Sequence, residues 1–567
     1  ERAARPVPSF VPPLLFMSSP SWADAALQQF DAIVQATAGF RPRPGQQQMA
    51  TLVAQTFERA QLGKVAEGEG ALQRALAVIQ AGTGVGKSLA YCVPAIHVAL
   101  ARGTRVLIST ATVALQEQLV HKDLPTLAAQ MPQPFAFALA KGRGRYVCKL
   151  KLERLLSGVG EDDDVVPDDL LAAEAAEQRL VRRSVAAQGE RAQFYASLAQ
   201  SLASSQWDGD RDQLPTPPEP ELWASVAADA HTCTNKHCPL FAQCSYFERR
   251  KELVAAQVIV ANHDLLLSSL GARLLPELDN CLLILDEAHH LPSTALAQFG
   301  CEMDITRLAW IDKLASRALR IGQLVEVEDI ADVPQHAARL RTHLQELARL
   351  VLALYAQPLR SDETPPLPGA RPSAAPRWGA GQPTRARVAE GQLPSELVEP
   401  LAQAAHHAGG FLEVLRAIAK ALRTQLRDKP DDARRLSQLY AQAGALAPRL
   451  EAVHACTQLL LQDTPAGGVP AAKWFTLAHE GDSRVLRAHA NPVLPGNALR
   501  QHLWSGARAA VLTSATLTSC GQFDFFLRES GLYGDADLTT LEVPSPFDYA
   551  RQGQLVVRET AADPREA

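Results

Sequence analysis

The segment AGTGVGKS, residues 81–88, has the residue types of a loop that binds phosphate groups. Its glycines allow backbone N–H groups to turn inward around phosphate oxygens at the start of a helix. Lys87 would reach the β- and γ-phosphates of a nucleotide, and Ser88 would hold Mg²⁺ through its hydroxyl group. A Gly-rich turn with an incidental lysine is the alternative, but an apolar run before the segment and a helical pattern after it favour the phosphate loop. The candidate nucleotide-binding residues here are Gly82, Thr83, Gly84, Gly86, Lys87 and Ser88.

A second segment, LLILDEAHH at residues 282–290, places two adjacent carboxylates at the end of an apolar run. Asp286 would bind Mg²⁺, directly or through water, and Glu287 would orient and deprotonate the water that attacks the γ-phosphate. For an Asp-Glu pair alone, helix caps and surface ion pairs would be the default interpretation. The phosphate loop upstream favours catalysis instead, so the candidate catalytic residues are Glu287, Lys87 and Asp286.

Four of the nine cysteines have a spacing that suggests a metal site. Cys233, Cys238 and Cys244 lie close together, and Cys148 lies far upstream of them. Zinc sites usually consist of two close pairs of ligands, whereas one distant and three loosely spaced cysteines fit a [4Fe–4S] cluster modestly better. Two histidines in the same stretch could bind zinc, so the spacing alone leaves both metals open.

The composition is that of a globular protein with several domains. The chain has 567 residues, of which 47% are hydrophobic and 21% charged, and its formal net charge is −5. This balance indicates no general affinity for polyanions, so any nucleic acid would be bound by local basic patches. The sequence shows neither a signal peptide nor an apolar run long enough to span a membrane, which favours a cytoplasmic, reducing location. In that location clustered cysteines bind metals more often than they form disulfides.

The candidate site residues follow short apolar runs of the kind that form buried parallel strands. This pattern predicts an α/β fold with a parallel sheet and a site at the carboxyl ends of its strands. The gaps from 110 to 257 and from 290 to 509 exceed one crossover helix, so we expect an insertion in each. The expected strands lie within residues 75–80, 105–110, 257–263, 281–290 and 509–517.

The second insertion is expected to be mainly helical. Two sets of apolar residues recur there at helical spacing and should face a core. Residues 363–394 between them are so rich in Pro and Gly that we expect a flexible loop. The two sets are Leu340, Leu344, Leu347 and Val351, and Phe411, Leu415, Ile418 and Leu422.

Together with further motifs, these segments resemble the XPD-like, iron–sulfur class of superfamily 2 helicases, and most closely the bacterial DinG-type DNA helicases. GFRPRPGQQQM, residues 39–49, is similar to the family's adenine-recognition motif, with Phe40, Arg43 and Gln46 as matching residues. STATVALQEQL, from residue 109, is similar to the motif whose loop touches the single strand. VLTSATL, from residue 511, is similar to the motif that couples hydrolysis to strand movement.

The resemblance implies an α/β fold: a RecA-like P-loop ATPase sheet with an inserted iron–sulfur domain and an inserted helical, arch-like domain. It implies ATP, Mg²⁺ and a [4Fe–4S] cluster as cofactors, with Cys148, Cys233, Cys238 and Cys244 as the cluster ligands. It implies that His289, Ser514 and Thr516 couple hydrolysis to movement along the strand. Contacts to DNA fall on Thr110, Lys141, Arg143, Arg145 and Tyr146. For each of these last residues, a solvated basic face or a core aromatic is an equally good interpretation.

The resemblance also suggests domain boundaries. Residues 1–39 would be an N-terminal extension, and the first RecA-like domain would consist of three parts, residues 40–140, 251–295 and 471–520. The iron–sulfur domain would comprise residues 141–250, and the helical insertion residues 296–470. Residues 521–567 would be the start of a second RecA-like domain. The family's second domain supplies arginines to the γ-phosphate, and no Gly-Arg-x-x-Arg-like run follows Pro546. We therefore expect the chain as given to be truncated, to bind ATP, to hydrolyse it poorly and not to unwind DNA.

The leading hypothesis is an ATP-dependent DNA helicase that moves 5′→3′ on single-stranded DNA in repair or replication, as a monomer without a membrane partner. Forked and R-loop DNA are the expected substrates. One alternative is a catalytically weak, nucleotide-gated DNA-binding module with a redox-sensitive cluster. Another is a zinc-bearing P-loop ATPase that acts on RNA or protein.

Overall fold

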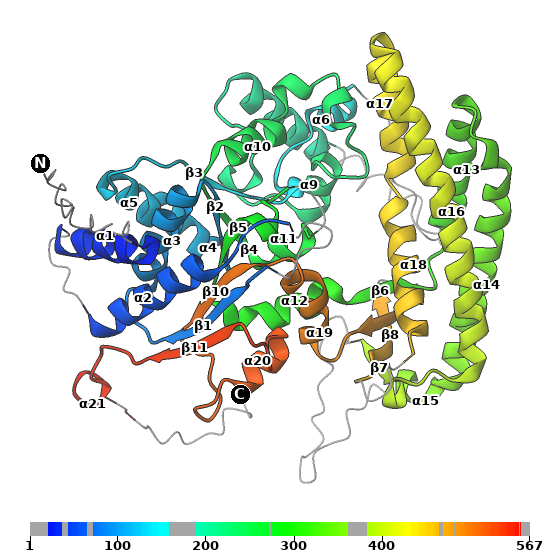
Figure 1. The fold of residues 1–567 in the computed structure, drawn as a ribbon. Helices are drawn as coiled ribbons and strands as arrows, with labels where there is room; N and C mark the ends of the chain where they lie inside the picture. Colours follow the sequence, from blue (N-terminus) through cyan, green and yellow to red (C-terminus); the bar gives the residue numbers. More distant parts are fainter. Residues whose placement is uncertain are drawn as a thin grey trace, which may run out of the picture.

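The computed structural model contains one parallel sheet, a cysteine-bearing region and a long helical insertion (Figure 1). It describes residues 21–36, 43–64, 72–157, 189–270, 274–360, 383–463, 469–480, 483–554 and 556. Of the candidate site residues, Phe40 alone lies outside these ranges. Among the described helices, none is both long and apolar enough to cross a membrane.

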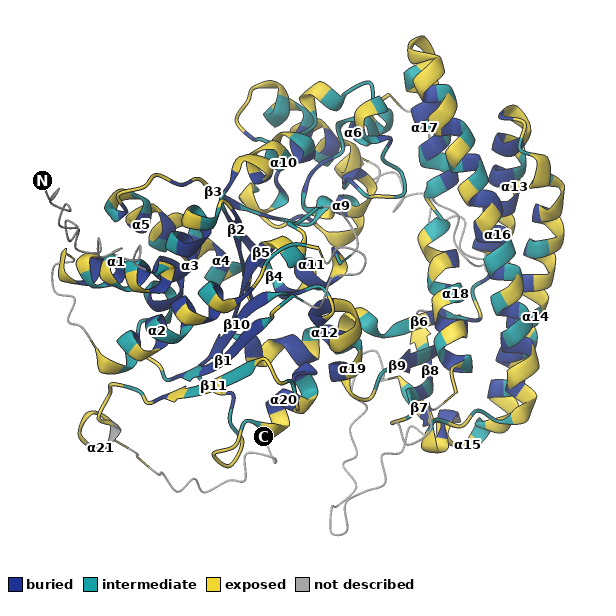
Figure 2. Cartoon of the chain, viewed as in Figure 1, coloured by how far each residue is buried: buried dark blue, intermediate teal, exposed yellow. Residues whose placement is uncertain are grey.

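The central sheet has seven parallel strands in the order β11-β1-β10-β5-β2-β4-β3. Each of the five predicted apolar runs contains one strand, which confirms the predicted α/β fold, while β3 and β11 are additional. The inner strands are buried because helices cover both faces of the sheet (Figure 2). The strands are β1 (Ala75–Ala81), β2 (Arg105–Thr110), β3 (Phe137–Leu139), β4 (Val258–Asn262), β5 (Cys281–Asp286), β10 (Ala509–Ser514) and β11 (Leu538–Val543).

Alternate residues along each strand enter two different cores. On β1, Ala77 and Ile79 pack toward one group of helices, and Leu76 and Val78 toward the other. The first group comprises α1 (Trp22–Ala36), α2 (Pro44–Arg59), α3 (Lys87–Arg102) and α5 (Leu124–Gln130), with α4 (Val113–Gln118) following β2. The second comprises α10 (Ser245–Ala255), α11 (His263–Ser268), α12 (Leu291–Phe299), α19 (Pro495–Leu499) and α20 (Asp524–Ser530).

The cysteine-bearing region is a small body with its own core. It contains α6 (Lys149–Leu156), a helix over residues 189–203 and α9 (Pro220–Val226). The indole rings of Trp207 and Trp223 meet edge to face in this core, with ring centroids 6.4 Å apart. This core fixes the segment that leads to Cys148 against residues that lie more than 50 positions later in the chain.

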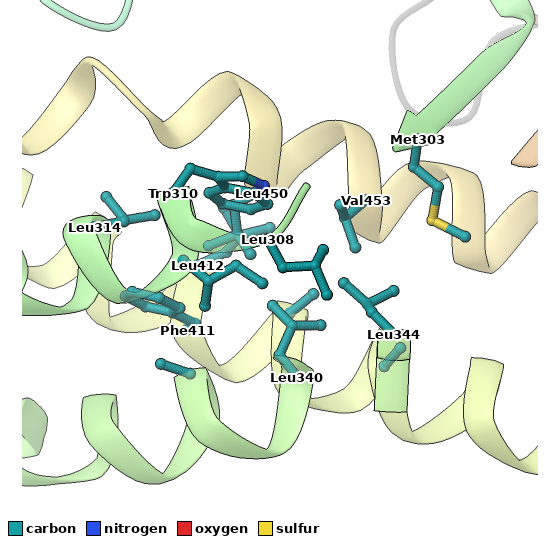
Figure 3. Close-up of a cluster of buried hydrophobic side chains, with 14 of the residues drawn as sticks. Met303, Leu308, Trp310, Leu314, Leu340, Leu344, Phe411, Leu412, Leu450 and Val453 are labelled. Atoms are coloured by element: carbon teal, nitrogen blue, oxygen red, sulfur yellow. The ribbon is translucent and has the colours of Figure 1, made fainter. Parts of the chain in front are cut away.

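The helical insertion confirms the predicted apolar stripes. Leu340, Leu344, Leu347 and Val351 on α14 are fully buried, and Phe411, Ile418 and Leu422 on α16 face them from the neighbouring helix. Figure 3 shows Leu340, Leu344 and Phe411 in this core together with Leu314 of α13 and Leu450 of α18. The helices are α13 (Ala309–Leu324), α14 (Val333–Leu354), α15 (Ala356–Arg360), α16 (Ser395–Asp428), α17 (Ala433–Gly444) and α18 (Ala447–Leu461).

A second, antiparallel sheet in the order β6-β9-β8-β7 closes the base of this insertion. Its strands are β6 (Cys301–Asp304), β7 (Thr384–Arg387), β8 (Ala472–Glu480) and β9 (Ser483–Asn491). Because β6 lies where the chain enters the insertion and β9 where it leaves, this sheet fastens the two ends together (Figure 1).

The structure corrects several predicted boundaries. Residues 472–491 belong to the sheet of the insertion and not to the RecA-like sheet, so the boundary at 470 is wrong. Residues 538–543 are an edge strand beside β1, so they do not begin a second domain. Helix α1, assigned to an extension, packs in the core with α2 and α3. In the Pro-rich segment, residues 363–382 lie outside the described part, but 384–387 form β7 where a loop was predicted.

Candidate functional site

The phosphate loop connects the carboxyl end of β1 to the first residue of α3. Gly84 and Gly86 have φ angles of 83° and 87°, in the left-handed region that only glycine adopts without strain. Gly86 directly precedes α3, so the loop presents the N-terminus of a 16-residue helix to the site. Such a terminus favours bound anions because its first N–H groups lack partners within the helix.

Lys87 and Glu287 form the centre of the site. Lys87 Nζ donates a hydrogen bond to Glu287 Oε1 at 2.7 Å, and both side chains are largely buried. Glu287 has a φ angle of 50°, an unusual value for a residue other than glycine that turns the chain at the end of β5. Burial opposes the charge, yet the hydrogen bond from Lys87 holds the pKa of Glu287 below its ordinary value.

Ser514 and His289 extend this pair into a chain of hydrogen bonds. Ser514 Oγ donates to Glu287 Oε2 at 3.0 Å and lies 2.7 Å from His289 Nδ1. Since the hydroxyl group has one proton and gives it to Glu287, His289 carries its own proton on Nδ1. Thr516 joins through its backbone N–H, 3.4 Å from Ser514 Oγ. The structure thus brings together the residues that the sequence assigned to catalysis and coupling.

Asp286 lies deeper than Glu287, at 6% exposure. Tyr91 Oη donates to its Oδ2 at 3.1 Å, and burial raises the pKa of Asp286 to about 6 although Lys87 opposes the shift. Burial, with Asp286 nearby, also raises the pKa of Tyr91, so the phenol remains a hydrogen-bond donor. Sequence reasoning missed Tyr91; the available signal was its position four residues after Lys87, on the same helix face.

Gln46 on α2 lies behind the phosphate loop. Its Nε2 donates to the carbonyl oxygen of Gly86 at 3.1 Å, while its buried Oε1 has no hydrogen-bond partner among the described residues. An acceptor in this state fits a ligand with an amino group, such as adenine. Arg43, at the start of α2, is exposed.

The segment after β11 crosses the phosphate loop, a contact that no sequence signal indicated. Ser545 Oγ donates to the Thr83 carbonyl oxygen at 2.9 Å. A Cβ atom added to Gly82 would lie 2.7 Å from the Ser545 nitrogen, and one on Gly84 would overlap the Phe547 ring. These glycines are therefore required by the close approach of residues 545–547 as well as by the loop.

The four predicted metal cysteines line one common cavity. Its apolar wall includes Phe241 and Phe247, and burial raises the pKa of Cys238 to about 11 and those of Cys148 and Cys233 above the ordinary value. Within the described ranges, no three His, Cys, Asp or Glu side chains converge closely enough to hold a single metal ion. The structure nevertheless brings all four predicted ligands to one place.

The residues predicted to contact DNA are engaged within the protein. Lys141 Nζ lies 2.7 Å from Asp210 and 2.8 Å from Asp212, and Arg145 pairs with Asp212 at 3.0 Å. These ion pairs engage the charges of Lys141 and Arg145 within the protein.

Two other residues predicted to contact DNA, Tyr146 and Thr110, are buried. Tyr146 is 4% exposed and packs on Tyr246 in the core, which agrees with the core-aromatic interpretation of this residue. Arg143 lies over the same Tyr246 ring at 4.5 Å. The Thr110 hydroxyl is buried, without a partner among the described residues.

Comparisons with known proteins agree with this arrangement. Residues 64–131 match the DEAD/DEAH box helicase family, and residues 227–308 match the DEAD_2 family. The ATP-dependent DNA helicase DinG of Photobacterium profundum is 31% identical over 521 residues, covering 90% of this chain and 69% of that protein. The chain belongs to the DinG family.

The DinG protein of Escherichia coli (strain K12) is similar at 30% identity over 547 residues, with 94% of this chain and 69% of that protein covered. Among solved structures, an XPD helicase matches with a TM-score of 0.37 and 13% identity, over 89% of this chain and 62% of that one. The DinG-family motifs coincide with the hydrogen-bonded chain around Glu287 described above.

Proposed function

We propose that the protein is an ATP-dependent DNA helicase whose hydrolysis site is the chain Lys87–Glu287–Ser514–His289. The observation that carries this proposal is that Glu287 touches both the phosphate-loop lysine and the residue that the family uses for coupling. A carboxylate in that position can respond to the nucleotide on one side and to strand β10 on the other. The activity for which DinG proteins are named, ATP-dependent helicase action on DNA, agrees with this arrangement.

Hydrolysis requires the Lys87–Glu287 pair to separate. The phosphates of ATP compete for Lys87, and the freed Glu287 accepts a proton from the attacking water. Because the pKa of Glu287 is already low, it is ionised before ATP arrives, and the position of its side chain controls the rate. Asp286 and Ser88 would hold Mg²⁺, which supplies charge neutralisation on the phosphates. Gln46 would orient the adenine through its unpartnered oxygen.

We further propose that the four cysteines hold a [4Fe–4S] cluster. The cavity that all four cysteines line and the family resemblance support this proposal. When bound, the cluster would tie Cys148 to the loop that carries the other three cysteines. Its thiols must first lose protons, which burial disfavours, so the cluster's positive iron atoms have to offset that cost.

The proposal also includes the direction of movement, the DNA substrate, the oligomeric state and the location of the protein. Movement in the 5′→3′ direction, forked or R-loop DNA as substrate, a monomeric state and a cytoplasmic location rest on the family resemblance. The internal pairing of Lys141 and Arg145 gives them no open charge for a DNA phosphate. The nucleic-acid track therefore depends on other residues or on a rearrangement of these pairs.

The helicase proposal is tested by ATP turnover with and without single-stranded DNA. Separation of a forked duplex tests the separate expectation that the chain as given hydrolyses ATP poorly and does not unwind DNA. Lys87→Ala should reduce turnover about 100-fold or more, because it removes a preorganised charge at the γ-phosphate. Lys64→Ala, at an exposed lysine that pairs with Glu277, is the matched control and should retain activity. DNA binding without DNA-stimulated turnover in the unmodified chain would favour the nucleotide-gated binding module instead.

The cluster proposal is tested by anaerobic purification followed by iron, acid-labile sulfide and zinc analysis. Cys238→Ser should lose iron and sulfide together, whereas Cys520→Ser, at an exposed cysteine outside the cavity, should keep both. Stoichiometric zinc without sulfide would overturn the cluster assignment.

A further inference from the structure

Gln80 occupies a position between the phosphate loop and the coupling residues. It is the last residue but one of β1, and its partners in the parallel ladder are Ser514 on β10 and Glu542 on β11. It therefore lies beside both the end of the strand that carries Ser514 and the strand that leads to the segment over the phosphate loop.

Three hydrogen bonds use both ends of the Gln80 carboxamide. Its Oε1 accepts from the backbone N–H groups of Leu517 and Thr518, at 2.6 and 2.7 Å. Its Nε2 donates to Glu542 Oε1 at 3.1 Å. The two accepted bonds fix the loop that follows Ser514, because they hold consecutive backbone groups of that loop to one atom of β1. The donated bond reaches an exposed carboxylate and contributes less.

The loop held by Gln80 also supports Ser514. Ser514 ends β10, and the backbone N–H of Thr516 lies 3.4 Å from its hydroxyl oxygen, so the loop turns directly around that hydroxyl. The same hydroxyl donates to Glu287. Any displacement of residues 516–518 therefore shifts the group that aligns the proposed general base.

We propose that Gln80 is a positioning residue for hydrolysis, which holds the loop after β10 so that Ser514 stays against Glu287. This inference rests on the proposed function of Glu287 and Ser514. Gln80 touches none of the nucleotide-binding residues in its side-chain hydrogen bonds, so its loss should lower kcat and leave the KM for ATP nearly unchanged. The required feature is the acceptor oxygen, which glutamate also has and methionine lacks.

The experiment compares Gln80→Met, Gln80→Glu and Glu542→Gln in the 567-residue chain. Gln80→Met keeps the length of the side chain but removes the acceptor, and DNA-stimulated kcat should fall about tenfold, because small displacements at a catalytic centre cost up to about 100-fold. Gln80→Glu should stay within about threefold of the unmodified protein, and so should Glu542→Gln. A Gln80→Met variant with unchanged kcat, or a Gln80→Glu variant as impaired as Gln80→Met, would overturn the proposal.

A second readout does not depend on activity. Hydrogen exchange in a peptide covering residues 515–520 should accelerate in Gln80→Met and not in Gln80→Glu, while a peptide covering 75–80 stays protected. If the unmodified protein shows no DNA-stimulated turnover, the proposed function fails, and the exchange data still decide whether Gln80 holds the loop. Exchange that accelerates equally in both peptides would mean that Gln80 merely stabilises β1, which would also overturn the proposal.

Discussion

At the scale of single residues, the nucleotide site is held in a resting state by its own charges. Lys87 and Glu287 neutralise each other at 2.7 Å, so neither is available until a stronger partner arrives. Asp286 differs from Glu287 because it has no lysine within hydrogen-bond distance and accepts from a neutral phenol instead. Two adjacent carboxyl groups thus have pKa values shifted in opposite directions, one by a paired cation and the other by burial.

Asp286→Asn is expected to stabilise the nucleotide-free protein at neutral pH. The raised pKa means that the folded chain binds this proton more tightly than the unfolded chain does, so Asp286 contributes least to stability above pH 6, where it is ionised and buried. A shift from 3.8 to about 6 corresponds to about 3 kcal/mol. The variant should therefore melt several degrees higher than the unmodified protein at pH 8, and the difference should vanish as the pH falls below about 4.

Melting temperatures from pH 4 to pH 8, without Mg²⁺ or nucleotide, check this expectation. Asp524→Asn, at an exposed position on α20, is the control and should shift the melting temperature little at any pH. An Asp286→Asn variant that is less stable at pH 8 would show that Tyr91 and Lys87 offset the cost of burial.

At the scale of elements, local patterns along the sequence predicted the buried strands and the motif residues. They did not predict contacts between segments that lie far apart in the chain. The apolar run CLLILD is buried on both faces and could only be an inner strand, whereas LTTLEV of β11 is half-exposed and resembles many loops. Lys87, Glu287 and Ser514 were found because each lies in a recognisable motif. Gln80 and Phe547 were missed because their contacts join residues more than 400 positions apart.

Phe411→Ala should loosen the helical insertion without affecting the nucleotide site. Phe411 on α16 is fully buried in a core that contains none of the residues of the central sheet, and its truncation should cost about 3–5 kcal/mol. Calorimetry should show an earlier melting transition for the insertion, while nucleotide affinity is retained. Val398→Ala, at a position on α16 that is 43% exposed, should change little. A loss of nucleotide binding in Phe411→Ala would mean that the two cores unfold as one unit.

At the scale of the whole molecule, the cysteine-bearing region rests on the helical insertion as well as on the sheet. Thr234 Oγ1 lies 3.1 Å from Ser437 Oγ in a buried contact, and Arg434 pairs with Glu153 at 3.0 Å. The first contact joins α17 to the loop that carries three of the cysteines, and the second joins α17 to α6 (Figure 1). The cysteine-bearing region therefore contacts both the central sheet and the helical insertion.

Gly444→Val should weaken the contact between α17 and the cysteine-bearing region. A Cβ atom at Gly444 would overlap the carbonyl oxygen of His231, a backbone atom that cannot move alone, and such overpacking costs about 1–3 kcal/mol. ATP affinity should be retained, and hydrogen exchange should rise at residues 231–237. Gly506→Ala, whose Cβ would meet its nearest neighbour at an ordinary 3.7 Å, is the matched control. A loss of ATP affinity, or unchanged exchange at residues 231–237, would contradict this expectation.

The order of strands in the central sheet has a consequence for how the protein is made. β1 lies between β10 and β11, and Gln80 is 437 residues away from its partner Leu517. At about 5–20 residues per second, a ribosome needs roughly 20–90 s to cover that distance. During this time the apolar strand that carries the phosphate loop has emerged with neither of its neighbours. The nucleotide pocket is thus completed only after β10 and β11 have been made, and chaperones have a long interval in which to bind β1.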